Sequence, residues 1–349
     1  MGFFENVLTK KSSAAESVAL VDIGADSVAG AYARYESGEL PTVVYARRTP
    51  IEAHAGETLE SAMLRALKAL GADMIREGAP ALARAAGSGS VARVIVSIET
   101  PWQETAVRVE EFERSGGTFE FTHGLVAERL GQISKGLPGK IVADESVIGT
   151  TLNGYETSRP YGKKAHRASV TVLASIIERR VAQDITAALA GIFHTRRISP
   201  VSGSSLRYQT IRNVFPHERD AVILDAAGRP RTAAALVRNG TLVSLTQTTI
   251  PVGEAGWAAT VKGQLAVIAE QYPLPRTIFL LARKSDSERI RQALAAAKLE
   301  SLWLSENPPK TVAVMQKHLL GMIRYLSAEP LDTNLLYMAL YYQAKGPVE

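Results

Sequence analysis

The chain has 349 residues, of which 46% are apolar, 21% charged and 6% aromatic, a composition typical of soluble globular proteins and not of disordered or fibrous ones. It contains no cysteine, which excludes disulfides, thiolate metal sites and thiol nucleophiles. Its 40 Lys and Arg exceed its 35 Asp and Glu by a net charge of +5, too small an excess to predict nucleic-acid binding.

Three short apolar segments near the N-terminus are separated by polar, glycine-bearing turns. They span residues 18–23, 28–35 and 40–46 and predict a meander of three strands. A helix is predicted over residues 58–77, because apolar side chains recur there at helical spacing behind a capping threonine. The small and polar residues at 79–90 predict a loop.

The chain changes character at residues 103–175, where short β segments surround one predicted helix near 123–134. Strands are predicted at 142–153 and 168–175, joined by a turn-rich link. This stretch therefore predicts a small inserted α+β unit. The elements predicted directly after it are helices at 179–192 and 202–213.

The opening pattern returns at residue 221. The segments 18–43 and 221–245 each begin with an apolar strand that ends in an aspartate, Asp22 or Asp225, followed by a small-residue turn and a second strand. Such self-similarity predicts two related halves, each a β-meander followed by helices. The elements predicted after the second meander are helices at 255–271, 288–297 and 311–326 and strands at 277–281 and 301–304.

The duplicated meanders, with an aspartate ending the first strand of each, resemble the actin-like ATPase superfamily, and more narrowly its PilM and FtsA branch. Residues 18–35, 145–178 and 196–228 carry this resemblance, and Pro160-Tyr161-Gly162 fills the Pro-x-Gly element of the branch's inserted subdomain. The resemblance implies an α/β fold that is duplicated and ribonuclease H-like, with a small α+β subdomain inserted in the first half.

The resemblance and the predicted elements together divide the chain into four units. They are an N-terminal tail at 1–17, a first half at 18–102 and 176–220, the inserted subdomain at 103–175, and a second half at 221–349.

In this superfamily a nucleotide lies between the halves, its phosphates held by two hairpin turns and its Mg²⁺ by carboxylates acting through water. By matching position, the resemblance assigns the first turn to Asp22, Gly24, Asp26 and Ser27, with Asp22 holding metal-bound water. It assigns the second turn to Asp225 and Gly228.

The second turn departs from the family pattern. Alanine stands where glycine is expected, and Pro230 removes a backbone donor from the phosphate loop. Residues 277–285, which match the element that packs against the adenosine, contain no glycine, and the helical segment after residue 251 is shortened. We therefore expect a pseudo-ATPase with no catalytic residues and no bound cofactor. ATP with Mg²⁺ at the same turns is the alternative.

Basic residues gather in and just after the inserted unit. The functional interpretation is a face for an acidic partner peptide or anionic lipid headgroups, and the structural alternative is a solvated helix surface. Nucleic acid ranks third, because aromatic residues for base stacking are scarce there. The candidate anion-binding residues are Arg159, Lys163, Arg196, Arg197 and Arg207.

The branch resemblance implies a cytoplasmic scaffold of the type IV pilus assembly platform, at the inner face of the cytoplasmic membrane. In PilM proteins the groove between the inserted subdomain and the first half takes up the cytoplasmic tail of the membrane protein PilN. Other platform proteins or a second copy of the chain are further partners. We expect membrane association only through a partner, because the longest apolar run, 335–344, is about half of a membrane span.

Two alternatives stay open. One is an FtsA-like division protein that tethers filaments to the membrane, although the short chain and its ending YYQAKGPVE, which lacks a basic amphipathic helix, favour PilM. The other is a working ATPase or small-molecule kinase of the same superfamily.

Overall fold

The structure, a computed structural model, describes residues 15–114, 116–135, 138–157, 159–227, 232–248, 250–283, 286–303 and 309–345. The first half is built on a six-stranded sheet of order β11-β4-β1-β2-β3-β17. The first three strands form an antiparallel meander, and β4 and β11 continue the sheet in parallel. The strands are β1 (Glu16–Ile23), β2 (Ser27–Tyr35), β3 (Thr42–Pro50), β4 (Arg93–Ile98), β11 (Ile198–Ser202) and β17 (Arg324–Tyr325).

The second half repeats this order in a five-stranded sheet, β14-β13-β12-β15-β16. Its meander is again antiparallel, and β15 and β16 again follow in parallel. The duplication predicted from the sequence is therefore confirmed strand by strand. The strands are β12 (Ala221–Asp225), β13 (Ala233–Arg238), β14 (Thr241–Gln247), β15 (Thr277–Leu281) and β16 (Lys310–Ala313).

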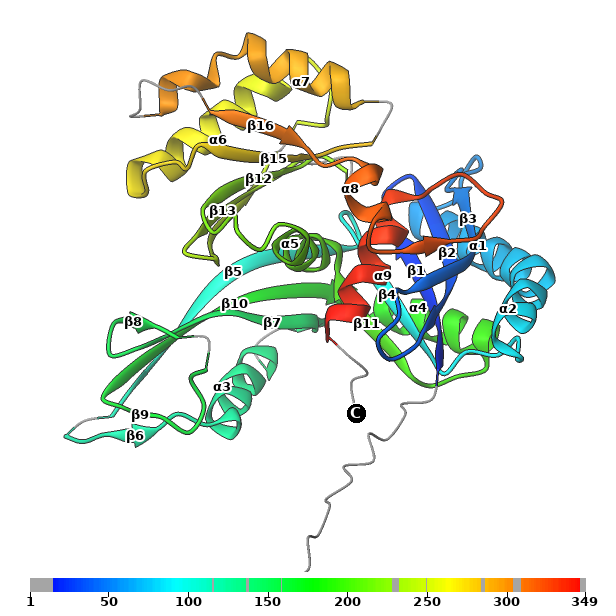
Figure 1. The fold of residues 1–349 in the computed structure, drawn as a ribbon, viewed down its shortest axis with the longest axis horizontal. Helices are drawn as coiled ribbons and strands as arrows, with labels where there is room; N and C mark the ends of the chain where they lie inside the picture. The colour runs from blue at the N-terminus through cyan, green and yellow to red at the C-terminus, as the bar shows by residue number, and fades with distance from the viewer. Residues whose placement is uncertain are drawn as a thin grey trace, which may run out of the picture.

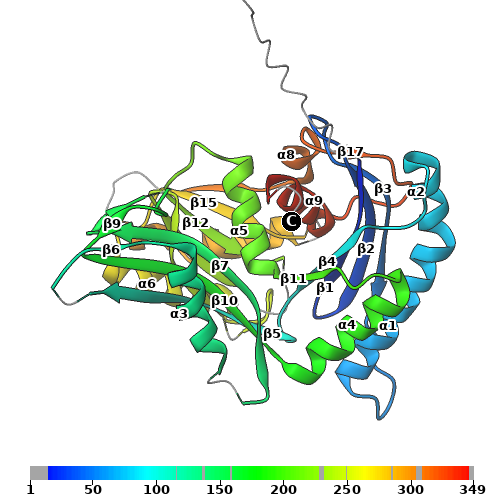
Figure 2. The ribbon, with the colours of Figure 1, turned by 90° about the horizontal axis from the view of Figure 1, so that it is seen from below.

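Helices form the layers outside and between the two sheets (Figures 1 and 2). One outer layer packs on the first sheet and contains α1 (Leu59–Asp73), a π-helical turn (Met74–Gly78), α2 (Ala79–Ala86) and α4 (Arg179–Phe193). The other packs on the second sheet and contains α6 (Trp257–Gln271), α7 (Ser287–Ala296) and a 3-10 turn (Leu299–Leu302). Two helices lie between the sheets in one shared core, α5 (Gly203–Val214) and α9 (Thr333–Lys345).

The period of two along a strand explains why both key aspartates face the space between the halves. In β1, Val18 and Leu20 belong to the shared core, whereas Ala19 and Val21 pack under the outer helices. Asp22 continues the inward-facing set. In β12 the same alternation divides the strand between the shared core and the outer helices, so Asp225 also faces inward.

The residues between β4 and α4 form the separate inserted unit (Figure 1). Its four-stranded sheet has the order β5-β10-β7-β8. Helix α3 (His123–Lys135) packs on it through a small core that includes Phe121 and Val126. The strands are β5 (Gln103–Glu113), β7 (Lys140–Leu152), β8 (Tyr155–Glu156) and β10 (Arg167–Glu178), with a separate pair of β6 (Phe119–Glu120) and β9 (Lys164–Ala165).

Several local predictions are wrong. Residues predicted as a loop after position 78 form α2, because Pro80 is tolerated in a first helical turn and Leu82 is buried. Of the strand predicted at 301–304, residues 301 and 302 instead belong to the 3-10 turn, and residue 304 lies outside the described residues. The helix predicted over 311–326 is β16, the short helix α8 (Gln316–Leu320) and β17. Parallel pairing of β16 with β15 overrides the local helical spacing.

The predicted extent of the second half also needs a correction, because the chain returns to the first half near its end. Strand β17 pairs with β3, and α9 packs against β1, β2 and α5. The apolar run at 335–344, for which the sequence analysis considers only a membrane span, is therefore part of a buried helix of the shared core. Among the described residues, no helix has both the length and the apolarity needed to cross a membrane.

Candidate functional site

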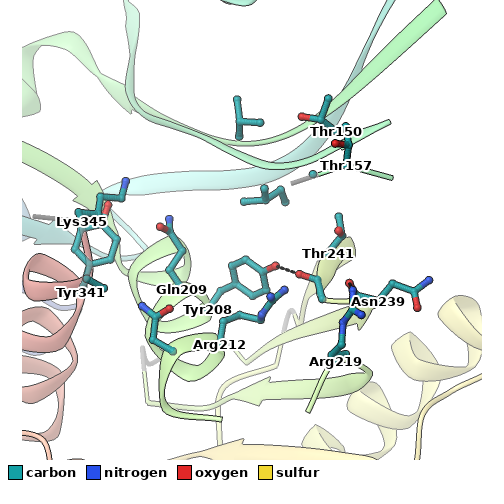
Figure 3. A pocket seen from close by; sticks show the side chains of 16 residues that line it. Thr150, Thr157, Tyr208, Gln209, Arg212, Arg219, Asn239, Thr241, Tyr341 and Lys345 are labelled. Atoms are coloured by element: carbon teal, nitrogen blue, oxygen red, sulfur yellow. Dashed lines mark hydrogen bonds between the residues drawn. The ribbon is translucent and has the colours of Figure 1, made fainter. Parts of the chain in front are cut away.

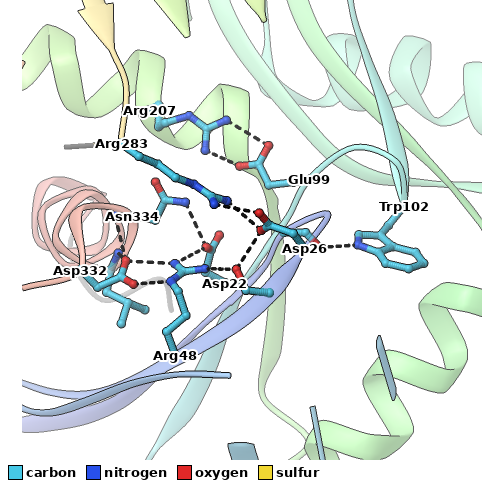
Figure 4. A network of polar contacts seen from close by, with 12 residues as sticks. Asp22, Asp26, Arg48, Glu99, Trp102, Arg207, Arg283, Asp332 and Asn334 are labelled. Carbon is cyan, nitrogen blue, oxygen red and sulfur yellow. Dashed lines mark hydrogen bonds and ion pairs between the residues drawn. The ribbon is translucent and has the colours of Figure 1, made fainter. Parts of the chain in front are cut away.

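A chain of ion pairs lies where the two halves meet (Figure 4), and we call this interface the cleft. Asp22, at the end of β1, is 1% exposed. Its Oδ2 accepts hydrogen bonds from Arg48 Nη2 at 3.1 Å and Asn334 Nδ2 at 3.0 Å, and its buried Oδ1 has no hydrogen-bond partner among the described residues. Arg48 is thus the cation that sits beside this carboxylate.

Arg48 of β3 connects three parts of the chain. Its Nε and Nη2 donate to the carboxylate of Asp332 at 2.6 and 3.1 Å, and its Nη1 donates to Ser27 Oγ at 2.8 Å. Burial lowers the pKa of Arg48, but the charges of Asp332 and Asp22 outweigh burial and raise that pKa. The guanidinium therefore remains charged in the position where the family resemblance places metal-bound water.

A second arginine ties the first-half turn to the second half. Arg283, two residues after β15, donates from both terminal nitrogens to the Asp26 carboxylate at 2.8 Å each. The hydrogen bonds from Arg283 lower the pKa of Asp26 to about 2. Both side chains are partly exposed, so the pair contributes about 1 kcal/mol at most, but its forked geometry fixes the spacing across the mouth of the cleft.

A third arginine lies deepest. Arg207 of α5 is 2% exposed and binds Glu99, which follows β4, and Asp225, which ends β12. Its Nη2 donates to Glu99 Oε2 at 3.0 Å. A Cβ at Gly203 would overlap the Glu99 carboxylate, so only glycine fits there. The Glu99–Arg207–Asp225 triad joins both halves through α5, and losing one member would leave a buried, unpaired charge.

The predicted turn residues that the structure describes do converge on this cleft. Gly24 closes the β1–β2 turn by donating its N–H to the Ser27 carbonyl at 2.9 Å. Ser27 Oγ donates to Asp26 Oδ1 at 3.0 Å. Gly228 lies outside the described residues.

The sequence analysis missed the partners of these residues, namely Arg48, Glu99, Arg283, Asp332 and Asn334. One signal was available. Asp332 Oδ1 accepts from the N–H groups of Asn334 and Leu335, which is a helix cap directly before an apolar run. A cap at this position would have predicted α9, but not its contact with Asp22.

Internal cations already bind two of the carboxylates that the family resemblance assigns to the nucleotide site, Asp22 and Asp26. In the described ranges no group of three His, Cys, Asp or Glu side chains is placed to hold a metal ion. The free Oδ1 of Asp22 offers one acceptor, but Arg48 and Asn334 already occupy Oδ2.

The prediction of an anion-binding face is wrong for Arg207, and the other four predicted residues do not lie on a single surface. Arg207 is buried and bound by two carboxylates, so it cannot meet an external anion. Arg196 and Arg197 are exposed in the turn from α4 to β11, and Arg159 and Lys163 are exposed between β8 and β9. These two connections lie at different ends of the molecule (Figures 1 and 2). Binding by any of these four residues stays a prediction.

A cavity of about 570 Å³ lies between the inserted unit, α5, the turn from β13 to β14, and the end of α9 (Figure 3). The inserted unit contributes residues 147–150 of β7, and α5 contributes Tyr208, Gln209 and Arg212. Gly149 permits this closeness, because a Cβ there would overlap Thr241 of β14.

Strand β7 carries a free edge along this cavity. On that side β8 pairs only with Thr151 and Leu152, and Thr157 N–H donates to the Thr150 carbonyl at 3.0 Å. No described strand pairs with the earlier part of this edge. A second cavity, of about 420 Å³, lies against residues 140–145. The strand also has irregular register at Ile148 and Ala143, and such bulges re-aim side chains beside binding sites.

Comparisons with known proteins address the fold. A structure of the PilM-PilN type IV pilus biogenesis complex matches with a TM-score of 0.53 at 13% identity, covering 95% of this chain and 99% of that one. The fold is actin-like. A Bacteroides thetaiotaomicron protein with an actin-like ATPase fold and unknown function matches with a TM-score of 0.46 at 10% identity, covering 93% of this chain and 95% of that one. No protein-family model matches the sequence, and no curated protein does.

The triad predicts a pH dependence of stability. Burial raises the pKa of Glu99 to about 7 from 4.5, opposed by Arg207 and reinforced by the charges of Asp225 and Asp22. The folded protein therefore holds this proton more tightly than the unfolded chain, so the stabilisation is present below the unfolded pKa and is lost as pH rises through about 7.

We expect the free energy of unfolding of the wild type, relative to Glu99→Gln, to fall by about 1–3 kcal/mol between about pH 5 and pH 8. Urea titrations at several pH values measure it. A difference that stays constant or rises with pH would contradict the shifted pKa.

Proposed function

We propose that this chain is a PilM-like scaffold of a type IV pilus assembly platform, which binds the cytoplasmic tail of a PilN-like membrane protein. The observation that carries the proposal is the free edge of β7 beside the cavity at α5 and α9. An extended peptide adds to such an edge through main-chain hydrogen bonds, while pockets along the edge take alternate side chains.

The inserted unit makes this edge accessible. Val147 is 40% exposed and lines the cavity, and Ile148 packs against the shared core at the bulge. A long exposed edge invites pairing with another chain. In this protein the edge is recessed between two units rather than presented on an outer face, which favours one bound peptide over open-ended aggregation.

The proposed scaffold works without nucleotide chemistry. Arg48 already neutralises Asp22, and Arg283 already binds Asp26, so two carboxylates that the resemblance gives to metal and phosphate contacts are committed to internal cations. Nucleotide binding would have to displace these pairs. We therefore infer a degenerate nucleotide site, in a protein located at the cytoplasmic face of the membrane through its partner.

The first test is direct binding of the tail. A synthetic peptide of the cytoplasmic segment of the PilN-like protein from the same organism is expected to bind the full chain, and Val147→Trp is expected to weaken binding about tenfold or more by filling the groove. Fluorescence anisotropy measures both. Val109→Trp is the matched control, because Val109 is also exposed but lies on β5, the other edge strand of the same sheet.

Failure of the wild type to bind this peptide would contradict the proposal. Lipid-dependent polymerisation of the chain, with no tail binding, would support the FtsA-like alternative instead.

The second test concerns the degenerate site. We expect isothermal calorimetry with Mg-ATP to give no binding tighter than about 1 mM, because internal arginines occupy Asp22 and Asp26. Sub-millimolar binding that Asp22→Ala abolishes would show a working nucleotide site and contradict this part of the proposal.

A further inference from the structure

The cavity beside β7 is lined by cations and by no carboxylate. Its charged lining residues are Arg212 of α5, Arg219 in the loop after α5, and Lys345 at the end of α9. They come from different parts of the chain and face one space (Figure 3). We call these three residues the cationic pocket.

The arginines of the cationic pocket lack the acidic partners that the cleft arginines have. Arg212 is half-buried, and no described carboxylate lies within 4.0 Å of its guanidinium nitrogens or of those of Arg219. Arg219 Nη2 donates to the Asn239 carbonyl at 2.9 Å. Because neither guanidinium is paired with a described carboxylate, both can form an ion pair with an acidic ligand.

Backbone geometry holds Arg212 in place. Gly240, in the turn between β13 and β14, has a φ of 81°, and a Cβ there would lie 2.7 Å from Arg212 Nη1. Glycine thus permits the turn conformation and lets the guanidinium lie against the turn. Tyr208 Oη also donates to the Gly240 carbonyl at 3.3 Å, which anchors the same turn to α5. Arg212 and Tyr208 of α5 therefore both lie against this turn.

We propose that the cationic pocket binds an aspartate or glutamate side chain of the partner tail that lies along β7. This inference rests on the proposed function, and it adds the chemistry by which the groove selects its peptide. A guanidinium fork matches a carboxylate in two parallel hydrogen bonds. Because alternate side chains of an extended peptide point the same way, one acidic residue at the right register reaches the pocket.

A peptide carboxylate accounts for the pocket better than a free phosphate does. The cavity is continuous with residues 147–150 of β7, whose edge supplies main-chain pairing that only a peptide uses. The cavity also has an apolar side at Val147, Ile148 and Tyr341, which suits the residues flanking an acidic side chain.

The test uses the fluorescein-labelled tail peptide of the PilN-like protein and two double variants with the same change in charge. We expect Arg212→Glu with Arg219→Glu to weaken binding about tenfold or more. Lys68→Glu with Arg84→Glu, at exposed residues of α1 and α2 that do not line the cavity, is expected to change it less than about twofold. Thermal unfolding curves show whether each variant is folded. If the variant with Arg212→Glu and Arg219→Glu does not fold, the variant with Arg212→Gln and Arg219→Gln replaces it in the binding measurement.

The peptide is changed in parallel. Replacing its acidic residues by Asn or Gln is expected to produce the same loss in the wild type and no further loss in the Arg212/Arg219 variant. Tail binding that is unaffected by either set of changes, or a bound segment without any acidic residue, would overturn the inference while leaving the proposed function intact.

A second probe separates the two claims. Two blocked extended hexapeptides, identical except for a central Glu or Lys, are titrated against the full chain. A preference for the Glu peptide that disappears in the Arg212/Arg219 variant supports the pocket even if the native tail does not bind, a result that would contradict the proposed function alone. Equal binding of both hexapeptides overturns the pocket's selectivity.

Discussion

One buried guanidinium holds the two halves of this protein together. Arg207 sits on α5 in the shared core, and its two carboxylates come from opposite halves, Glu99 after β4 and Asp225 at the end of β12. All three side chains are nearly inaccessible to water. Such a triad adds little net stability over an apolar core, but breaking it costs about 3–5 kcal/mol. We infer that the triad fixes how the two sheets face each other. The more exposed ion pairs of Arg48 and Arg283 join further parts of the chain across the same interface.

The same helix connects the cleft to the cavity beside β7. Arg207 is the central residue of the triad. The cavity beside β7 is lined by three later residues of the same helix, Tyr208, Gln209 and Arg212. Any rotation of α5 that shifts the triad also moves the groove wall. At the other end of the cleft, Arg48 lies beside Asp22 and Arg283 beside Asp26.

The sequence predicts the strands and turn residues that follow a repeated or alternating pattern. It does not predict side chains and helices whose burial depends on contacts with distant parts of the chain. Asp22 and Asp225 were found because each ends an apolar strand in a duplicated pattern. Arg207 was misread as a surface charge, because its partners lie 108 and 18 residues away and nothing local marks it as buried. Helix α9 was missed because an apolar run of its length fits several environments, and only packing between two sheets selects one.

We infer that the internal ion pairs of Arg48, Arg207 and Arg283 hold the two halves in one arrangement without nucleotide. Because the chain has no cysteine, spin labels can be placed at Lys68→Cys on α1 and Ala295→Cys on α7, exposed positions in opposite halves. The distance between them, measured by double electron–electron resonance, tests the claim directly. We expect one narrow distance distribution that Mg-ATP does not change. A broad distribution, or one that narrows or shifts when Mg-ATP is added, would contradict it.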